Sequence, residues 1–248
     1  MITALKRYGT LLGFAAIILF FWFNLPDTFM TARNWLNISQ QVSMLAVIAF
    51  TMTIVMVMGD FDLSVGSMAS LSGICAALLF AQGYSVPTGI AAGLMVGVIG
   101  GLFNGFLVSF VGILPFVATL GTLTMFSGLA FLVSDGKTIF GRDIPKSFGG
   151  IARSGIDLDA IGLAGLSLPF LTILALVVLF LVWFTLEHTG FGRRLYAIGG
   201  NAEAARLAGV KVRKLRMIAF GLTGLGAATG GLMLASRVAS AGSWVTSS

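Results

Sequence analysis

Long apolar segments alternate with short polar ones along the whole chain. About 20 mostly apolar residues make a helix long enough to cross the hydrocarbon core of a bilayer. The alternation therefore predicts an all-α, polytopic membrane helix bundle of about seven transmembrane helices. The predicted spans are residues 8–25, 42–58, 63–81, 86–111, 116–133, 166–186 and 217–235. The second is short and the fourth is long, which favours tilted or broken geometry in both.

The composition agrees with a protein built for lipid. Hydrophobic residues make up 57% of the 248 positions and charged residues only 10%, whereas a soluble domain carries about 25% charged residues. The net charge of +6 is not a nucleic-acid signal, because the basic residues are not interleaved with aromatic ones. The single cysteine, Cys75, excludes an intrachain disulfide and a cysteine-based metal cluster.

The positions of the basic residues predict the orientation in the membrane. Lys6 and Arg7 precede the first span, and the polar segment 187–216 holds seven of the fifteen Lys and Arg residues. Seven alternating spans place both clusters on one side, and short basic loops stay in the cytoplasm. We therefore expect one transmembrane domain, residues 1–248, with a cytoplasmic N-terminus and a cytoplasmic loop at 187–216.

The fourth predicted span carries a glycine at every fourth position. Such spacing gives one smooth strip along a helix face, and close backbone approach through small residues drives helix packing in lipid. The strip predicts the buried centre of the bundle, with a self-dimerising face as the alternative. Asn104 lies in the same span and needs a hydrogen-bond partner. The packing residues are Gly89, Gly93, Gly97, Gly101 and Gly105.

Two carboxylates interrupt the apolar run between the second and third spans, in the sequence GDFDLSVG at 59–66. An ionised Asp at a helix centre costs roughly 2.5–3.5 kcal/mol, so Asp60 and Asp62 must lie at an aqueous end, in a polar cavity or at a helix break. One interpretation is a short turn between antiparallel spans; the other is a discontinuous helix that lines a translocation path. Asp62 or Ser64 could cap the third span.

Candidate catalytic residues are otherwise scarce. The one histidine, His188, fits no zinc motif, and the chain has no phosphate-binding G-x-x-x-x-G-K-[ST] loop. We expect no enzyme activity, no metal and no cofactor. Within the basic loop, Asn201 is a good helix N-cap, Glu203 suits the first turn, Arg206 the last, and Gly209 ends the helix. A helix of about two turns at 202–208 is marginal alone in water, so it must pack against something.

Four segments resemble the ribose/xylose/arabinose-type permease subunits of ATP-binding cassette importers. They are GDFDLSVGSMASLSG at 59–73, GLFNGFLV at 101–108, PFVATLGTLTMFSG at 115–128 and GFGRRLYAIGGNAEAARLAG at 190–209. The last is the most specific. Asp60 departs from the resemblance, because family members carry a second glycine there.

The resemblance implies a permease domain with type II importer-like helices in a bacterial inner membrane. The implied partners are a cytoplasmic ATPase, which hydrolyses ATP on a separate chain, a second permease subunit and a periplasmic sugar-binding protein. It also implies a coupling helix in loop 187–216, whose ATPase-coupling residues are Gly199, Gly200, Asn201, Glu203, Ala204, Ala205, Arg206 and Gly209. The implied polar residues of the substrate pathway are Asp60, Asp62, Ser64, Asn104, Thr119 and Thr122. Family members continue with three more spans, so we expect an incomplete second repeat and a C-terminally truncated chain.

Two other functions fit the residues taken alone. In an ion-coupled secondary transporter, Asp60 and Asp62 would carry the coupling proton or ion. In a non-transporting membrane scaffold, the basic loop would recruit a partner. The sequence favours the importer permease, and it does not identify the sugar.

Overall fold

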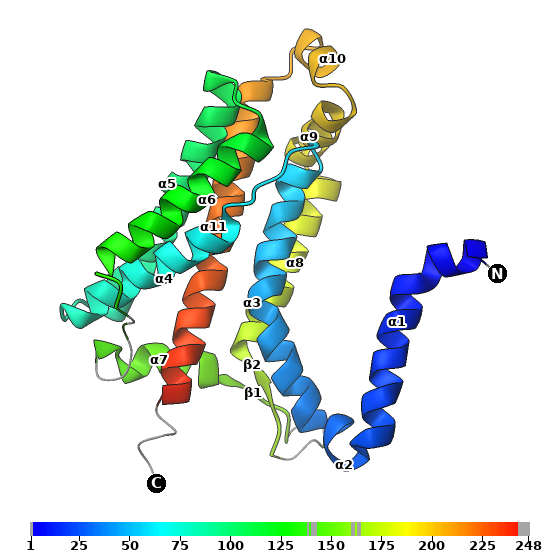
Figure 1. Cartoon of the computed structure of the whole chain (residues 1–248), viewed down its shortest axis with the longest axis vertical. Coiled ribbons are helices and arrows are strands. Elements are labelled where there is room, and N and C mark those ends of the chain that lie inside the picture. Colours follow the sequence, from blue (N-terminus) through cyan, green and yellow to red (C-terminus); the bar gives the residue numbers. More distant parts are fainter. Residues whose placement is uncertain (1, 138, 140–142, 160–161, 163–164, 243–248) are drawn as a thin grey trace.

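The computed structural model describes residues 2–137, 139, 143–159, 162 and 165–242. Helices dominate these residues, and one short hairpin joins two of them (Figure 1). The long helices are α1 (Ile2–Asn24), α3 (Ala32–Met56), α4 (Val65–Ala81), α5 (Val86–Phe106), α6 (Pro115–Val133), α8 (Phe170–His188) and α11 (Val212–Gly242). The connecting elements are α2 (Pro26–Phe29), the π-helix η1 (Leu107–Val111), α7 (Lys146–Arg153), β1 (Gly155–Asp157), β2 (Ser167–Pro169), α9 (Gly190–Gly200) and α10 (Ala202–Leu207).

Each of the seven predicted spans coincides with a helix. Five helices are long and apolar enough to cross a membrane, and the segments Tyr8–Asn24 and Val65–Ala81 are shorter apolar helices. The all-α membrane bundle is therefore confirmed.

Two predicted boundaries are wrong. The sixth span does not start at Leu166, because strand β2 occupies Ser167–Pro169 and α8 begins at Phe170. The second span does not start at Val42, because α3 begins at Ala32 and is not short. Its early polar side chains are satisfied: the Ser39 hydroxyl donates to the carbonyl of Leu36, and the Gln40 amide donates to the carbonyl of Ala152.

The long fourth span does change its geometry. The α-helical part α5 ends at Phe106, and the π-helix η1 follows over Leu107–Val111. Gly112 ends it with a φ of +85°, a left-handed conformation that glycine adopts without steric cost.

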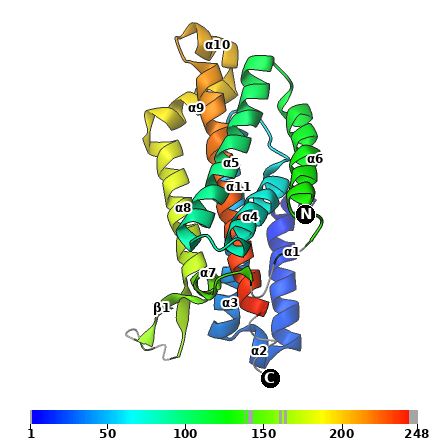
Figure 2. The same ribbon diagram turned by 90° about the vertical axis from the view of Figure 1, so that its left-hand side faces the viewer.

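Helix α11 runs through the middle of the bundle and packs against α3, α4, α5 and α7 (Figures 1 and 2). Its closest neighbour is the glycine strip of α5. A Cβ at Gly97 would lie 2.4 Å from the Gly224 carbonyl oxygen, and one at Gly101 would lie 2.3 Å from the Phe220 carbonyl oxygen. Gly105 faces the backbone of Met217 in the same way. The strip therefore lies in the buried centre of the bundle, as the spacing predicts.

At its other end the strip meets the backbone and side chains of α4. A Cβ at Gly93 would lie 3.0 Å from the Ser72 carbonyl oxygen of α4, and one at Gly89 would lie 2.2 Å from the ring of Phe80. All five strip glycines are buried, so α5 packs tightly against both α4 and α11.

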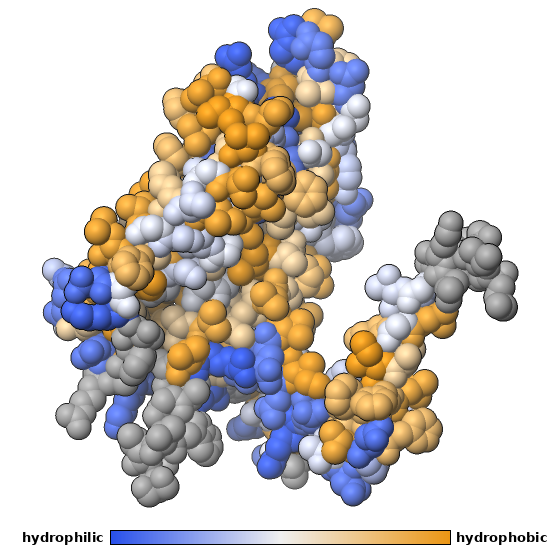
Figure 3. Space-filling view, viewed as in Figure 1, coloured by the Kyte–Doolittle hydropathy of each residue, from blue (hydrophilic) through white to orange (hydrophobic). Residues whose placement is uncertain are grey.

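The two ends of the bundle differ in structure. Helices α9 and α10 lie at one end, whereas α7 and the antiparallel β1–β2 hairpin lie at the other (Figure 1). Helix α1 extends away from the other helices, and its surface is largely hydrophobic (Figure 3).

Candidate functional site

A buried hydrogen-bonded cluster joins the α3–α4 connection to α5. The Asp62 carboxylate accepts from the Ser64 backbone amide at 2.9 Å and from the Ser64 hydroxyl at 2.6 Å. The Asn104 side-chain amide of α5 donates to the Ser64 hydroxyl oxygen at 2.8 Å and to Asp62 Oδ2 at 3.3 Å. All three side chains are fully buried. We call Asp62, Ser64 and Asn104 the polar cluster.

The polar cluster accounts for the break between α3 and α4. Ser64 occupies the N-cap position of α4, but its hydroxyl does not bond to the first amides of the helix. That hydroxyl is committed to Asp62 and Asn104 instead. The interruption is therefore a non-helical segment whose polar side chains Asp60, Asp62 and Ser64 are buried, while Gly59 and Phe61 are exposed.

Two predicted pathway threonines lie beside this segment on α6. The Thr119 hydroxyl donates to the Pro115 carbonyl at 2.8 Å and lies 3.4 Å from the Phe61 carbonyl. The Thr122 hydroxyl donates to the Thr119 carbonyl at 3.3 Å. Including Asp60, all six predicted pathway residues are at most 5% exposed, so water does not reach them in this conformation. Two of their acceptors, Asp60 Oδ2 and Asn104 Oδ1, are buried without a hydrogen bond to the described residues.

Asp60 forms an ion pair that the sequence reasoning missed. Its Oδ2 lies 2.7 Å from Nε of Arg216, in the first turns of α11. The Asp60 side chain is 6% exposed and that of Arg216 is 23% exposed. Because an unpaired buried charge is very costly, the buried Asp60 carboxylate requires the Arg216 guanidinium. The sequence feature that could have indicated this ion pair is the position of Arg216, the last basic residue before an apolar stretch.

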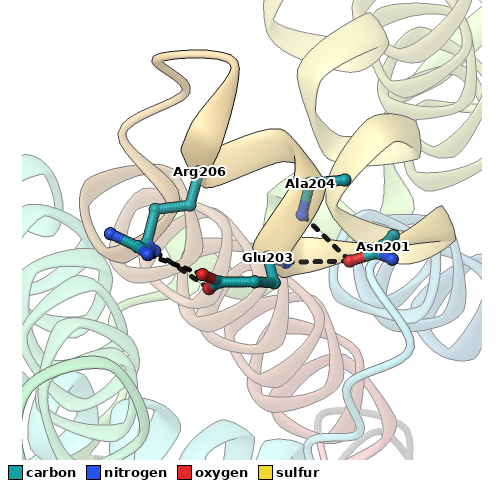
Figure 4. Close-up of polar contacts among 4 residues, drawn as sticks. All are labelled: Asn201, Glu203, Ala204 and Arg206. Carbon is teal, nitrogen blue, oxygen red and sulfur yellow. Dashed lines mark hydrogen bonds and ion pairs between the residues drawn. The ribbon is translucent and has the colours of Figure 1, made fainter.

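Helix α10 is built as its capping signals predict (Figure 4). The Asn201 side-chain oxygen accepts from the amides of Glu203 and Ala204, both at 3.0 Å. Arg206 donates from Nε to the Glu203 carboxylate at 2.9 Å. That bond lowers the pKa of Glu203 and raises the pKa of Arg206. The chain turns after the helix at Gly209, whose φ is +86°.

The surface of α10 is partly apolar. Leu207 is 75% exposed at its end, and Ala204 and Ala208 are exposed beside it. Leu207 was not among the predicted coupling residues. The sequence feature that could have drawn attention to it is an apolar side chain within a polar loop. Ala205, which was among them, is buried in the chain's own hydrophobic core, so its side chain faces the bundle.

A basic pocket of about 450 Å³ lies next to α10. Arg194, Lys211 and Lys214 line it together with Gly209. The predicted residues Gly199, Gly200 and Asn201 are exposed at the junction of α9 and α10. The end of the molecule at α10 thus presents exposed cations as well as an exposed leucine.

Two contacts connect this end to the α3–α4 segment. A Cβ at Gly199 would lie 2.1 Å from the Val57 carbonyl oxygen, so α9 lies directly against the end of α3. The Asp60–Arg216 ion pair joins the same segment to α11. Helix α9 and the first turns of α11 therefore both contact the segment that holds the polar cluster.

Comparison with known proteins identifies related chains. The family model described as "Branched-chain amino acid transport system / permease component" matches residues 34–245. The ribose import permease protein RbsC of Bacillus subtilis is 35% identical over 238 residues, which cover 96% of this chain and 70% of that protein. The L-arabinose transport system permease protein AraH of Escherichia coli is 38% identical over 238 residues, with 94% and 68% covered.

A third relative has a different printed substrate. The autoinducer 2 import system permease protein LsrC of Escherichia coli is 34% identical over 215 residues, which cover 86% of this chain and 59% of that protein. No solved structure matches.

Proposed function

Because this chain belongs to the permease components of ATP-binding cassette importers, we propose that it forms part of the membrane pathway for a sugar or sugar-like solute. The relatives named for ribose, L-arabinose and autoinducer 2 support this substrate class. The observation that carries the proposal is α10, a capped short helix that projects an exposed leucine and exposed charges from one end of the bundle.

In this proposal α10 docks into a cytoplasmic ATPase. A six-residue helix cannot be stable alone, and here Ala205 anchors it to the bundle while Leu207 remains exposed. Interfaces combine an apolar centre with a polar rim, and Leu207 would supply the apolar centre of this contact. Glu203 and Arg206 provide the rim, and the basic pocket at Lys211 favours an acidic partner surface. In this arrangement the protein lies in a bacterial inner membrane, with the N-terminal end of the chain and loop 187–216 on the cytoplasmic side.

The proposed mechanism uses the two contacts at the α3–α4 segment. Closure of an ATPase pair would push α10 and α9, and the contact of Gly199 with Val57 would pass the movement to the end of α3. The Asp60–Arg216 ion pair keeps α11 attached to the same segment. The polar cluster then opens or closes toward the substrate pathway. This pathway lies between this permease and a second permease subunit, and a periplasmic binding protein delivers the solute to it.

The rival role for the carboxylates has little support. An ion-coupling carboxylate must change its partner during transport, whereas Asp60 is neutralised by Arg216 and Asp62 is held by Ser64 and Asn104.

Co-purification of the ATPase tests the proposal. Arg206→Glu replaces the ion pair with two like charges one turn apart, and we expect it to abolish co-purification while membrane insertion is unchanged. Arg206→Gln separates loss of the cation from repulsion, and Lys146→Glu at the opposite end is the matched control. If Arg206→Glu retains the ATPase as well as Lys146→Glu does, α10 is not the docking helix.

A further inference from the structure

A basic pocket and an apolar groove lie on the same face of α11. The basic pocket, of about 450 Å³, is lined by Arg194 of α9 together with Lys211 and Lys214 at the start of α11. Helix α9 lies beside this part of α11 (Figure 2). The apolar groove, of about 180 Å³, is lined by residues of α3, α8 and α11. Helix α8 packs mainly against α3 and α9, so a groove remains between α8 and α11.

The helical spacing of α11 connects the pocket to the groove. Lys214 lines the pocket, whereas Leu222, Leu225 and Thr229 line the groove. Ile218 lies between them, four residues from both Lys214 and Leu222. Positions three and four residues apart share one helix face, and Ile218 is 44% exposed. One accessible strip of α11 therefore runs from the pocket into the groove.

The length of this strip matches one leaflet of a bilayer. Fifteen residues separate Lys214 from Thr229, which is ~22 Å along an α-helix. A bilayer with its headgroup regions is about 40–45 Å thick, so one leaflet is about half of that. A phospholipid with its phosphate near Lys214 therefore fits the strip from end to end.

The basic pocket offers unpaired cations to an anion. None of Arg194, Lys211 and Lys214 forms an ion pair with another described residue. No carboxylate is found among the described residues that line the pocket. The pocket also lies at the N-terminal end of α11, where the helix dipole favours negative charge. Guanidinium and ammonium groups both bind phosphate oxygens, so this pocket favours a phosphate group.

The groove has the chemistry of an acyl-chain site. Its walls are mostly Val, Leu and Ile side chains. Two of its three threonines, Thr51 and Thr229, donate their hydroxyl hydrogens to carbonyls of their own helices at 3.0 and 2.8 Å, so they offer no hydrogen to a ligand. An α-helix with its side chains is about 10–12 Å across and could insert only its side chains into a groove of about 180 Å³. An acyl chain, in contrast, can lie along the groove.

We propose that the basic pocket and the apolar groove together bind one anionic phospholipid. Its headgroup phosphate lies between Arg194, Lys211 and Lys214, and one acyl chain passes Ile218 into the groove. Basic pockets between membrane helices on the cytoplasmic side bind anionic headgroups in this way. The assignment to the cytoplasmic leaflet rests on the proposed orientation of loop 187–216, whereas the binding itself does not.

The groove distinguishes a lipid from the other anions that suit the pocket. A carboxylate on the ATPase or a soluble phosphate would reach the cations, but neither uses an apolar groove on the same face of α11. The proposed docking of α10 is carried by Leu207, which does not line the pocket. That docking therefore does not depend on which anion the pocket holds.

Native mass spectrometry of the purified full chain tests the site with phosphatidylglycerol, phosphatidylcholine and glycerol phosphate as probes. We expect phosphatidylglycerol to be retained over phosphatidylcholine, and an Arg194→Gln, Lys214→Gln double variant to bind it at least about tenfold more weakly. The matched control is an Arg193→Gln, Arg213→Gln double variant, which removes the same charge from exposed positions of the same two helices outside the pocket wall. The control should bind phosphatidylglycerol as the wild type does.

A second pair of variants tests the groove. Leu181 lines the groove and is 54% exposed, whereas Leu176 of the same helix is 55% exposed and does not line it. Leu181→Trp fills the groove and should weaken phosphatidylglycerol binding at least about threefold, roughly the effect of displacing one buried methylene group. Leu176→Trp should leave the affinity unchanged. Leu207→Ser should also leave it unchanged, so failure of the α10 proposal and failure of this one are told apart.

Three results would overturn the proposal. The first is equal retention of phosphatidylglycerol by the two double variants, or by the two tryptophan variants. The second is binding of glycerol phosphate as tight as that of phosphatidylglycerol, which would make this a site for a soluble anion. The third is unchanged lipid binding by the Arg194→Gln, Lys214→Gln variant together with weakened association of the ATPase, which would assign these cations to the ATPase contact.

Discussion

A single methyl group at Gly97 tests the close contact between α5 and α11. In Gly97→Ala the new Cβ would lie 2.4 Å from the Gly224 carbonyl oxygen and 2.4 Å from the Ala228 Cβ, whereas ordinary contact begins at 3.4 Å. The two helices must therefore separate by about 1 Å. The Gly224 oxygen belongs to the backbone, so no side-chain rotation can relieve the clash.

The cost follows from two opposing effects. Inserting a group into a packed core costs about 1–3 kcal/mol, and a backbone clash belongs at the upper end of that range. Alanine gains about 0.5–1 kcal/mol over glycine inside a helix. We therefore expect Gly97→Ala to lower the free energy of unfolding by about 2 kcal/mol. The same separation loosens the contact at Gly101. Gly97→Leu adds a larger side chain at the same place, so it should prevent correct packing of α5 against α11.

This free energy of unfolding can be measured by equilibrium unfolding in mixed micelles, in which the concentration of a denaturing detergent is increased stepwise. Gly128→Ala on α6 is the matched control, because Gly128 is exposed and its new Cβ would meet nothing within 4 Å. It should be as stable as the wild type or up to about 1 kcal/mol more stable. Equal stability of Gly97→Ala and Gly128→Ala would refute the argument from close packing.

Three other predictions concern the Asp60–Arg216 ion pair, Leu207 and Glu203. Arg216→Gln should lower the free energy of unfolding by about 3 kcal/mol, because it leaves the buried Asp60 carboxylate unpaired, whereas Asp60→Asn should cost less, because the Arg216 side chain is 23% exposed. The double variant should recover part of this, and additive losses in the same unfolding assay would exclude the ion pair. Leu207→Ser should leave unfolding unchanged but weaken ATPase binding at least about tenfold in a titration; unchanged affinity would remove Leu207 from the interface. Since the folded-state pKa of Glu203 is lowered, its ion pair stabilises α10 fully above the ordinary glutamate pKa. That contribution is lost as the pH falls through the lowered value. The protection factors of the α10 amides, which correct for the intrinsic slowing of hydrogen exchange in acid, should therefore fall at low pH, and Glu203→Gln should abolish this fall in protection.

Local signals in the sequence were sufficient for the spans and for α10. Apolar length determines where a membrane helix can form, and the cap at Asn201 acts within three residues of the chain. Tertiary contacts decided the features that were missed. Helix α9 begins and ends with glycines, which disfavour helix, and it is held in place by buried Gly192, Leu195 and Ile198.

The candidate site was likewise only partly predictable from local sequence. The carboxylates of the 59–66 segment were recognisable as functional candidates because charge is costly in lipid. Their partners were not, since Asn104 and Arg216 lie far away in the sequence and only the folded bundle brings them together. Arg194 and Lys214 likewise line one pocket only because α9 and α11 meet in the folded bundle.

The most direct test of the account is a cross-link from α10 to the ATPase. A Leu207→Cys variant, made after Cys75→Ala removes the chain's one native thiol, should form a cross-linked product with the co-expressed ATPase subunit. Lys146→Cys at the opposite end should form none. A complex that assembles and hydrolyses ATP normally, but cross-links through Lys146→Cys and not through Leu207→Cys, would contradict the assignment of α10 as the docking helix.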